Sequence, residues 1–217
     1  MCERYTYIPT ASEVKAYQDA NLGDLSPNYN VAPMQKMPVI TSDGLEVMKW
    51  GLVPSTSKEF KSSFTSINAR GETLADKPIY RTPFKKYRCL VPASGFYGWQ
   101  QRPTFKQSYY FSLKEQKNFH FAGLFDVWYD AQSVAHKSFT IITTSANKTI
   151  EDVQDRMPVI LHPADEALWL DYAAEPEALQ LLLRPYEDDD MVRYEVDRSV
   201  GNIKNNHKDL LLPLNSK

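Results

Sequence analysis

The stretch that decides the fold is residues 88–144, which contain five short runs: RCLVP at 88–92, GFYGW at 95–99, SYYFSL at 108–113, FHFAGLF at 119–125 and SFTIITT at 138–144. Runs of this length, rich in aromatic and β-branched residues and separated by short connections, are typical of β-strands. Five of them in succession predict a meander or a barrel-like sheet.

The segments on either side add a hairpin and several short helices. Asp43-Gly44 lies between the alternating runs 37–41 and 45–50 and predicts a β-hairpin. The capping-box spacing of Thr10 and Glu13 predicts a helix that reaches about Ala20. We also expect helices at 147–153, 163–172 and 176–183, and a last strand at 191–196. With no internal repeat or linker, we expect one domain over residues 1–217, with a barrel-like β-sheet and short helices.

Composition limits the classes of function. The 217 residues carry a net charge of -2, so nucleic-acid binding has to come from a local patch. The most basic window, 77–88, interleaves cations with aromatic residues, a pattern more often found in a solvated segment with packing aromatics.

Cysteine and histidine usage argues against metal sites. Only two cysteines, Cys2 and Cys89, and four scattered histidines are present, with no metal-ligand spacing, so we expect no metal and no cofactor. We find neither a signal peptide nor about 18 consecutive apolar residues, and we therefore expect a cytoplasmic monomer that makes no membrane contact.

Cys2 is the first candidate for chemistry. Removal of Met1 would leave an α-amine, with a pKa of about 7.7 to 8.0, and a thiol, with a pKa of about 8.5, on adjacent carbons. Such a pair condenses with an aldehyde to a thiazolidine ring, or serves as an acyl-transfer nucleophile with its own amine as base. By position alone, a cysteine in a frayed terminus is the simpler interpretation.

Nine segments in order carry a family resemblance. They are Cys2 with Arg4, Tyr29-Asn30-Val31-Ala32-Pro33, Trp50-Gly51-Leu52-Val53-Pro54, Asn68-Ala69-Arg70-Gly71-Glu72-Thr73, Arg88-Cys89-Leu90-Val91-Pro92-Ala93, Gly95-Phe96-Tyr97, Phe121-Ala122-Gly123-Leu124, Thr143-Thr144-Ser145-Ala146-Asn147 and Asp155-Arg156-Met157-Pro158-Val159-Ile160-Leu161. Each is weak by itself, but together they resemble the SOS response-associated peptidase (SRAP) family, which protects abasic sites in single-stranded DNA by a covalent crosslink. A peptidase activity that removes the family's own N-terminal methionine is also attributed to it.

The resemblance implies an α+β fold, a single domain with a mostly antiparallel, barrel-like β-sheet flanked by short helices, and it implies roles for particular residues. Cys2 would form the thiazolidine, and Asn68 would hold the sugar oxygen through its amide donors. Phosphate binding would fall to Arg4, Arg70 and Arg156. Nucleotides would pack against Trp99 and the loop from Asn30 to Pro33, with Trp50 as a weaker candidate.

Structural interpretations stand beside these roles. Asn68 in its local sequence is equally well a helix cap, and Arg70 and Arg156 are candidates for ion pairs near Glu72 and Asp155. Tryptophans in strands, such as Trp50 and Trp99, are more commonly core residues.

Two positions depart from the family pattern. Gly98 stands where the resemblance implies an acid-base glutamate, and Gln154 where it implies a histidine, so neither can transfer a proton. Glu3, where glycine is usual, is a candidate replacement for this proton transfer, although strand alternation points it away from the Cys2 side chain.

The sequence therefore predicts an abasic-site sensor that binds single-stranded DNA and crosslinks through Cys2, with weakened or rerouted acid-base chemistry. The alternative is a catalytically degenerate single-stranded-DNA-binding module without covalent chemistry, and a cysteine-peptidase-like enzyme ranks third because no histidine is an obvious partner for Cys2.

Overall fold

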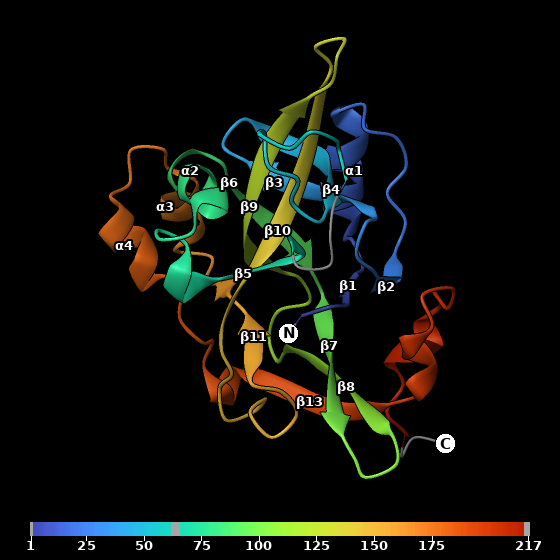
Figure 1. Ribbon diagram of the computed structural model, residues 1–217. Helices are drawn as coiled ribbons and strands as arrows, with labels where there is room; N and C mark the ends of the chain where they lie inside the picture. The colour runs from blue at the N-terminus through green and yellow to red at the C-terminus, as the bar shows by residue number, and fades with distance from the viewer. Residues whose placement is uncertain (1, 62–65, 215–217) are drawn as a thin grey trace.

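The computed structural model describes residues 2–61 and 66–214 and consists of two β-sheets flanked by short helices (Figure 1). The larger sheet contains the strands β3 (Lys36–Thr41), β4 (Gly44–Trp50), β5 (Asn68–Arg70), β6 (Arg88–Ala93), β9 (Phe119–Tyr129), β10 (Ala135–Ser145), β11 (Arg156–Pro158) and β12 (Ile160–Leu161). The smaller sheet has the order β13-β8-β7-β1-β2 and contains β1 (Tyr5–Tyr7), β2 (Asn28–Val31), β7 (Gly95–Gln101), β8 (Lys106–Leu113) and β13 (Met191–Val196).

Five strands of the larger sheet close into a barrel. They run in the order β10-β4-β3-β6-β9, and β9 pairs again with β10 to complete the ring. The pairings are antiparallel except that of β4 with β10, so the barrel is mixed. The predicted barrel-like sheet is confirmed, and so is the hairpin at Asp43-Gly44, which joins β3 to β4 in continuous register.

The two sheets share one hydrophobic core. Tyr5 from the smaller sheet makes edge-on ring contacts with Trp50, at 5.2 Å between centroids, and with Phe121, at 5.8 Å, both from the barrel. All three side chains are buried. A shared core of this kind agrees with the single domain expected from the sequence.

Short helices cover one side of the barrel: α2 (Pro78–Lys86), α3 (Glu166–Leu170) and α4 (Pro176–Leu181) (Figure 1). The basic window thus forms α2, which buries Tyr80 and Phe84 and leaves Lys85 and Lys86 exposed. The predicted first helix is α1 (Ala11–Asp19), and its capping box forms because the Thr10 hydroxyl accepts from the Glu13 amide. Among the described residues, no helix has the length and apolar character to cross a membrane.

One predicted helix is absent. Residues 148–153 form turns, with α-type bonds only from Glu151 N–H to Asn147 C=O and from Gln154 N–H to Ile150 C=O. The segment instead takes its shape from contacts with β13 and the turn before it, which a helical pattern in the sequence does not reveal. The helices expected at 163–172 and 176–183 are present in shortened form as α3 and α4.

Candidate active site

Cys2 and Asn68 form the centre of the candidate site. Asn68 begins β5, and its side-chain Nδ2 donates to the Cys2 carbonyl oxygen at 2.7 Å. Because this acceptor has to face an N–H, the orientation of the Asn68 amide is determined, and the Asn68 Oδ1 is left buried without a hydrogen-bond partner among the described residues. Asn68 lies within a strand, so the helix-cap interpretation does not apply.

The Cys2 thiol is fully buried. Its Sγ lies 3.9 Å from the Arg4 carbonyl oxygen. Burial raises the pKa of the Cys2 thiol to about 12, and the nearby Glu3 carboxylate contributes to the rise. At neutral pH the sulfur is therefore a protonated thiol, the less nucleophilic form. Met1, whose removal the chemistry requires, lies outside the described residues.

Arg70 lies beside this pair on the same strand. Residues two apart on a strand point to the same face, so Arg70 shares the face of Asn68. Its side chain is exposed. The Arg70 charge also helps to hold the pKa of Glu72 below its usual range, after the larger effect of the Arg156 hydrogen bond.

Arg156 forms an internal ion pair. It donates from Nη1 to Glu72 Oε1 at 2.6 Å and from Nη2 to Glu72 Oε2 at 2.9 Å, and Nη2 also reaches the Thr143 carbonyl oxygen at 2.6 Å. Its partner is Glu72 and not the expected Asp155. A bidentate pair of this kind occupies the face of the guanidinium that would otherwise bind a phosphate.

Arg4 and Asn30 also face the protein. Arg4 donates to Asn30 Oδ1 at 2.7 Å and to the carbonyl oxygens of Val200, at 3.1 Å, and Gly201, at 3.0 Å. Asn30 Nδ2 donates to the carbonyl oxygens of Val200, Asn202 and Asn205. Both side chains are buried and attach the C-terminal segment, and the DNA contacts expected of them stay a prediction.

The tryptophans divide between core and surface. Trp50 is fully buried, stacks on Phe139 and donates to the Ile67 carbonyl oxygen at 2.9 Å, as the core interpretation expects, and its nucleotide stacking stays a prediction. Trp99 is partly exposed and lines a cavity of about 160 Å³ together with Glu3, Lys106 and Gln154. Pro33 is likewise partly exposed. Lys106 has no counterpart among the residues singled out from the sequence, because a lone lysine in a hairpin carries no signal.

Gly98 and Gln154 face each other across this site. A Cβ atom built on Gly98 would lie 3.1 Å from Gln154 Oε1 and 2.9 Å from Phe111 Cε2. The Gln154 amide is held in place because its Nε2 donates to the Arg156 carbonyl oxygen at 2.8 Å. The two positions that depart from the family pattern are therefore one structural unit, in which Gln154 occupies space that a larger residue 98 would need.

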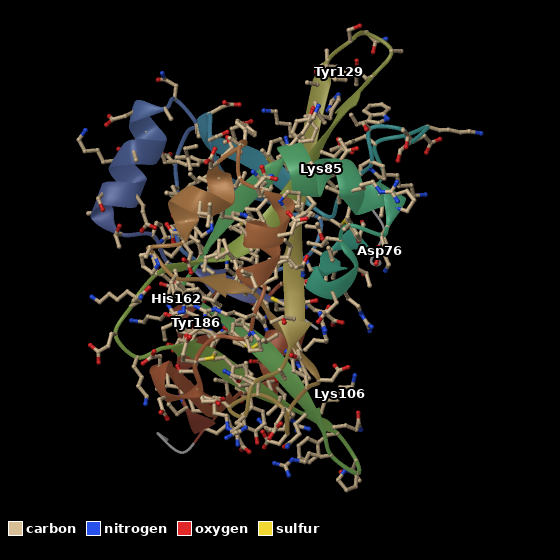
Figure 2. All side chains as sticks on the ribbon, turned by 90° about the vertical axis from the view of Figure 1, so that its left-hand side faces the viewer. Asp76, Lys85, Lys106, Tyr129, His162 and Tyr186 are labelled. Carbon is tan, nitrogen blue, oxygen red and sulfur yellow. The ribbon has the colours of Figure 1, made fainter. Side chains whose placement is uncertain are left out.

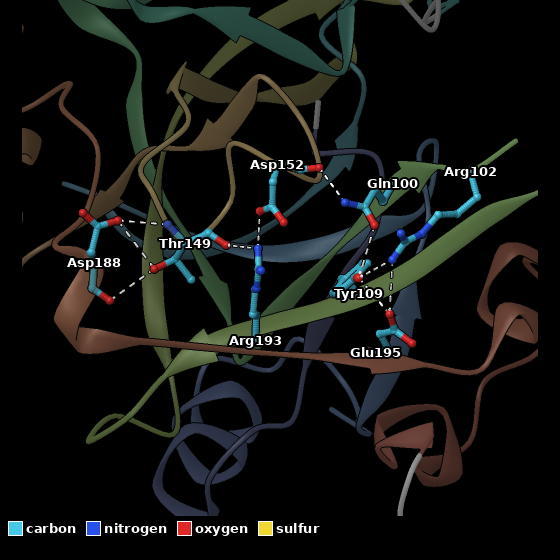
Figure 3. A network of polar contacts seen from close by, with 8 residues as sticks. All are labelled: Gln100, Arg102, Tyr109, Thr149, Asp152, Asp188, Arg193 and Glu195. Carbon is cyan, nitrogen blue, oxygen red and sulfur yellow. Dashed lines mark hydrogen bonds and ion pairs between the residues drawn. The ribbon is translucent and has the colours of Figure 1, made fainter.

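A polar network holds the loop that carries Gln154 (Figure 3). Arg193 of β13 donates to the Thr149 carbonyl oxygen at 2.9 Å and pairs with Asp152, while Gln100 of β7 donates to the Asp152 carbonyl oxygen at 2.8 Å. The Arg193 hydrogen bond lowers the pKa of the Asp152 carboxyl. Across residues 2–61 and 66–214, three or more His, Cys, Asp or Glu side chains nowhere gather as metal ligands would.

Comparisons with known proteins agree in family and fold. The family model described as SOS response associated peptidase (SRAP) matches residues 1–203. The abasic site processing protein YoqW of Bacillus subtilis (strain 168) is 39% identical over 223 residues, which cover 97% of this chain and 99% of YoqW. The abasic site processing protein HMCES of Xenopus tropicalis is 33% identical over 228 residues, covering 88% of this chain and 67% of HMCES. A crystal structure of a protein from Bacteroides thetaiotaomicron superposes with a TM-score of 0.88 at 28% identity and covers 98% of this chain and 99% of that one.

Proposed function

Because the chain belongs to the SOS response associated peptidase (SRAP) family, we propose that it processes abasic sites by binding single-stranded DNA and attaching covalently to the abasic sugar through Cys2. Its relatives YoqW and HMCES are named abasic site processing proteins. The observation that supports the proposal most directly is the hydrogen bond between Asn68 Nδ2 and the Cys2 carbonyl oxygen, because it fixes the backbone of the nucleophile beside an unpartnered acceptor.

The covalent step balances as a condensation. Hydrolysis of the Met1–Cys2 peptide bond consumes one water and frees the Cys2 amine. The amine attacks the aldehyde carbon of the ring-opened abasic sugar, and uptake of one proton and loss of one water give an iminium ion. The Cys2 sulfur then attacks the same carbon while its proton passes to a base, which closes the thiazolidine ring and leaves the ring nitrogen neutral.

The order of attack follows from the thiol. Burial raises the pKa of the Cys2 thiol, which keeps thiolates scarce at neutral pH, whereas a free α-amine has a pKa of about 7.7 to 8.0. The amine therefore reacts first, and the iminium it creates is a strong enough electrophile for a sulfur whose proton is lost during ring closure.

We propose a second role for Asn68 beside the expected one, in which its amide donors hold the sugar oxygen. One of its amide donors is used by the Cys2 carbonyl, and its unpartnered Oδ1 is an acceptor. We infer that Oδ1 accepts from the freed Cys2 amine or from a sugar hydroxyl. An acceptor at that position orients the amine lone pair toward the aldehyde and satisfies a buried oxygen that is costly to leave unpaired.

DNA contacts are assigned to the exposed residues of the site. Arg70 is proposed to bind a phosphate with its exposed guanidinium, and Trp99 and Pro33 to pack against nucleotides. Stacking on an aromatic side chain contributes about 1 to 3 kcal/mol per base and does not read the sequence, which suits a protein that recognises a missing base.

The test is a denaturing gel of the intact protein incubated with single-stranded DNA that carries one abasic site. Mass spectrometry first establishes that Met1 has been removed. Wild type should give a slower, protein-sized band, and Cys2→Ala should give none, while Cys89→Ala serves as the matched cysteine control and should still crosslink. A wild-type sample without Met1 that gives no shifted band would contradict covalent attachment.

A second candidate function is the non-covalent binding module, which Gly98 and Gln154 favour because neither titrates. It predicts salt-sensitive binding to single-stranded DNA that survives Cys2→Ala, with no band on the denaturing gel.

Glu3 remains our proposal for the missing proton carrier. It is exposed, follows Cys2 directly and lines the cavity that Gln154 also lines. General acid-base catalysis contributes about 10² to 10⁴-fold, so Glu3→Gln should slow crosslinking at least tenfold. The rate constant for band formation at saturating DNA measures this, and an unchanged rate excludes the role.

A further inference from the structure

The cavity lined by Glu3, the residue that follows Cys2, is also lined by a lysine, Lys106. Lys106 begins β8 and lines the 160 Å³ cavity with Glu3, Trp99 and Gln154. Within the described residues its ammonium makes no hydrogen bond and no ion pair. Arg102, the nearest cation in sequence, is paired with Glu195 at 3.6 Å and donates to the Tyr109 hydroxyl at 3.2 Å, so it is less free to bind a ligand.

Strand register places Lys106 beside Trp99. In the β7–β8 hairpin Trp99 lies opposite Ser108 and Gln101 opposite Lys106. Trp99 and Lys106 are therefore diagonal neighbours on one face of the hairpin, a separation that a long side chain spans. A nucleotide that packs on Trp99 would bring its phosphate within reach of the ammonium.

The negative charge of Glu3 requires a cation in this cavity if a phosphate is to enter it. Of the residues that line the cavity, Glu3 is the acidic one and Gln154 is neutral. A phosphate entering beside Cys2 would meet the Glu3 carboxylate and be repelled unless a positive charge offsets it. Lys106 is the cation in this lining, and a lysine ammonium is a compact charge suited to a phosphate.

We propose that Lys106 is a DNA-binding residue of this site, whose ammonium binds the phosphate of the nucleotide packed on Trp99. The proposal rests on the proposed function for its substrate, single-stranded DNA, and requires no covalent step. Arg70, beside Asn68, would then bind a second phosphate, so that the abasic sugar is held over Cys2 between two cations. Lys106 positions the DNA and does not touch the reacting atoms.

The first experiment measures binding without chemistry. Fluorescence anisotropy with intact single-stranded DNA that has no abasic site is recorded over a range of salt concentrations for wild type, Lys106→Gln and Lys106→Arg. Loss of one phosphate contact should reduce the slope of log K against log salt by about 0.7. We expect this reduction and a several-fold weaker affinity for Lys106→Gln, with both largely restored in Lys106→Arg.

Lys85→Gln is the matched control. Lys85 is exposed on α2, far from Lys106 in Figure 2, and should leave slope and affinity unchanged. Thermal unfolding should be the same for all variants, because the Lys106 ammonium has no partner among the residues that the structure describes. An unchanged slope in Lys106→Gln, or an equal loss in Lys85→Gln, would overturn the proposal.

The second experiment separates positioning from chemistry. With abasic DNA, Lys106→Gln should raise the DNA concentration for half-maximal crosslinking rate several-fold and change the saturated rate less than about twofold. A lower saturated rate with unchanged binding would overturn the phosphate role. If wild type binds DNA but forms no crosslink, the proposal of covalent attachment is wrong. The salt dependence of binding in Lys106→Gln then still tests whether Lys106 binds a phosphate.

Discussion

At the scale of single residues, burial controls the chemistry of Cys2. The thiol lies in the common core with Tyr5 and Cys89, and burial raises the pKa of all three groups. A protonated thiol reacts slowly, so the Cys2 sulfur is protected from unrelated oxidants and electrophiles. The amine freed from Met1 is then the group that begins the reaction.

The two buried thiols predict a loss of stability at alkaline pH. Their pKa values are raised in the folded state above about 8.5, the value in the unfolded chain, so the unfolded state releases protons first. Stability is fully present below about pH 8.5, and each thiol should then lower the free energy of unfolding by about 1.4 kcal/mol per pH unit.

Urea unfolding between pH 7.5 and about pH 10 measures this loss. Cys89→Ala should be less stable than wild type at neutral pH and should lose stability less steeply as pH rises, because one of the two titrating thiols is gone. Equal slopes for wild type and Cys89→Ala would show that the buried thiol is not responsible.

At the scale of elements, the site depends on how the loop 146–155 meets strand β7. Arg193 and Gln100 hold the loop, and the loop sets Gln154 against Gly98 (Figure 3). Gln154 thus fits against residue 98 because Gly98 has no side chain.

Enlarging residue 98 tests this fit. Gly98→Ala should destabilise the protein by about 1 to 3 kcal/mol, because its Cβ would approach Phe111 Cε2 to 2.9 Å and Gln154 Oε1 to 3.1 Å. In the double variant with Gln154→Ala, part of the loss should be recovered, giving a coupling of at least about 0.5 kcal/mol. Urea unfolding of the four proteins measures both quantities.

Gly201→Ala is the control, since a Cβ there meets nothing within 4 Å. It should be neutral within about 0.5 kcal/mol. Strict additivity of Gly98→Ala and Gln154→Ala would contradict the contact between the two positions.

At the scale of the whole molecule, the first strand is attached to the far end of the chain. Arg4 and Asn30 bind the carbonyl oxygens of residues 200–205, which follow β13 in the 3-10 helix Arg198–Gly201 and the turn after it. The candidate nucleophile is two residues from Arg4, so the C-terminal segment supports the position of Cys2.

Arg4 and Arg70 should therefore respond differently to the same substitution. Arg4→Met removes three charge-assisted hydrogen bonds from a buried site and should cost about 2 to 4 kcal/mol of unfolding free energy. Arg70→Met should leave stability within about 0.5 kcal/mol and weaken binding to single-stranded DNA several-fold. Urea unfolding and anisotropy on both variants measure the two effects, and a stable Arg4→Met protein with weakened DNA binding would restore Arg4 as a phosphate contact.

The sequence by itself determined the local features of the fold, which are the strands, turns and helix caps that depend on residues close together in the chain. The runs within 88–144 are rich in aromatic and β-branched residues and have short connections, so β6 to β10 were predictable, as were the Asp43-Gly44 hairpin and the Thr10 capping box. Motif order identified the family and singled out Cys2 and Asn68, whose side chain and backbone meet in the structure.

Only the tertiary structure decided which polar and aromatic side chains face solvent. Arg4 and Val200 are 196 residues apart, so no local pattern separates the buried Arg4 from the exposed Arg70, or the core Trp50 from Trp99 at the cavity. The loop 146–155 follows the same rule, because long-range bonds from Arg193 and Gln100 outweigh a weak helical preference. Lys106 became visible as a candidate only when folding set it beside Trp99 and Glu3, since a lysine is chosen for function by its surroundings and not by its neighbours in sequence.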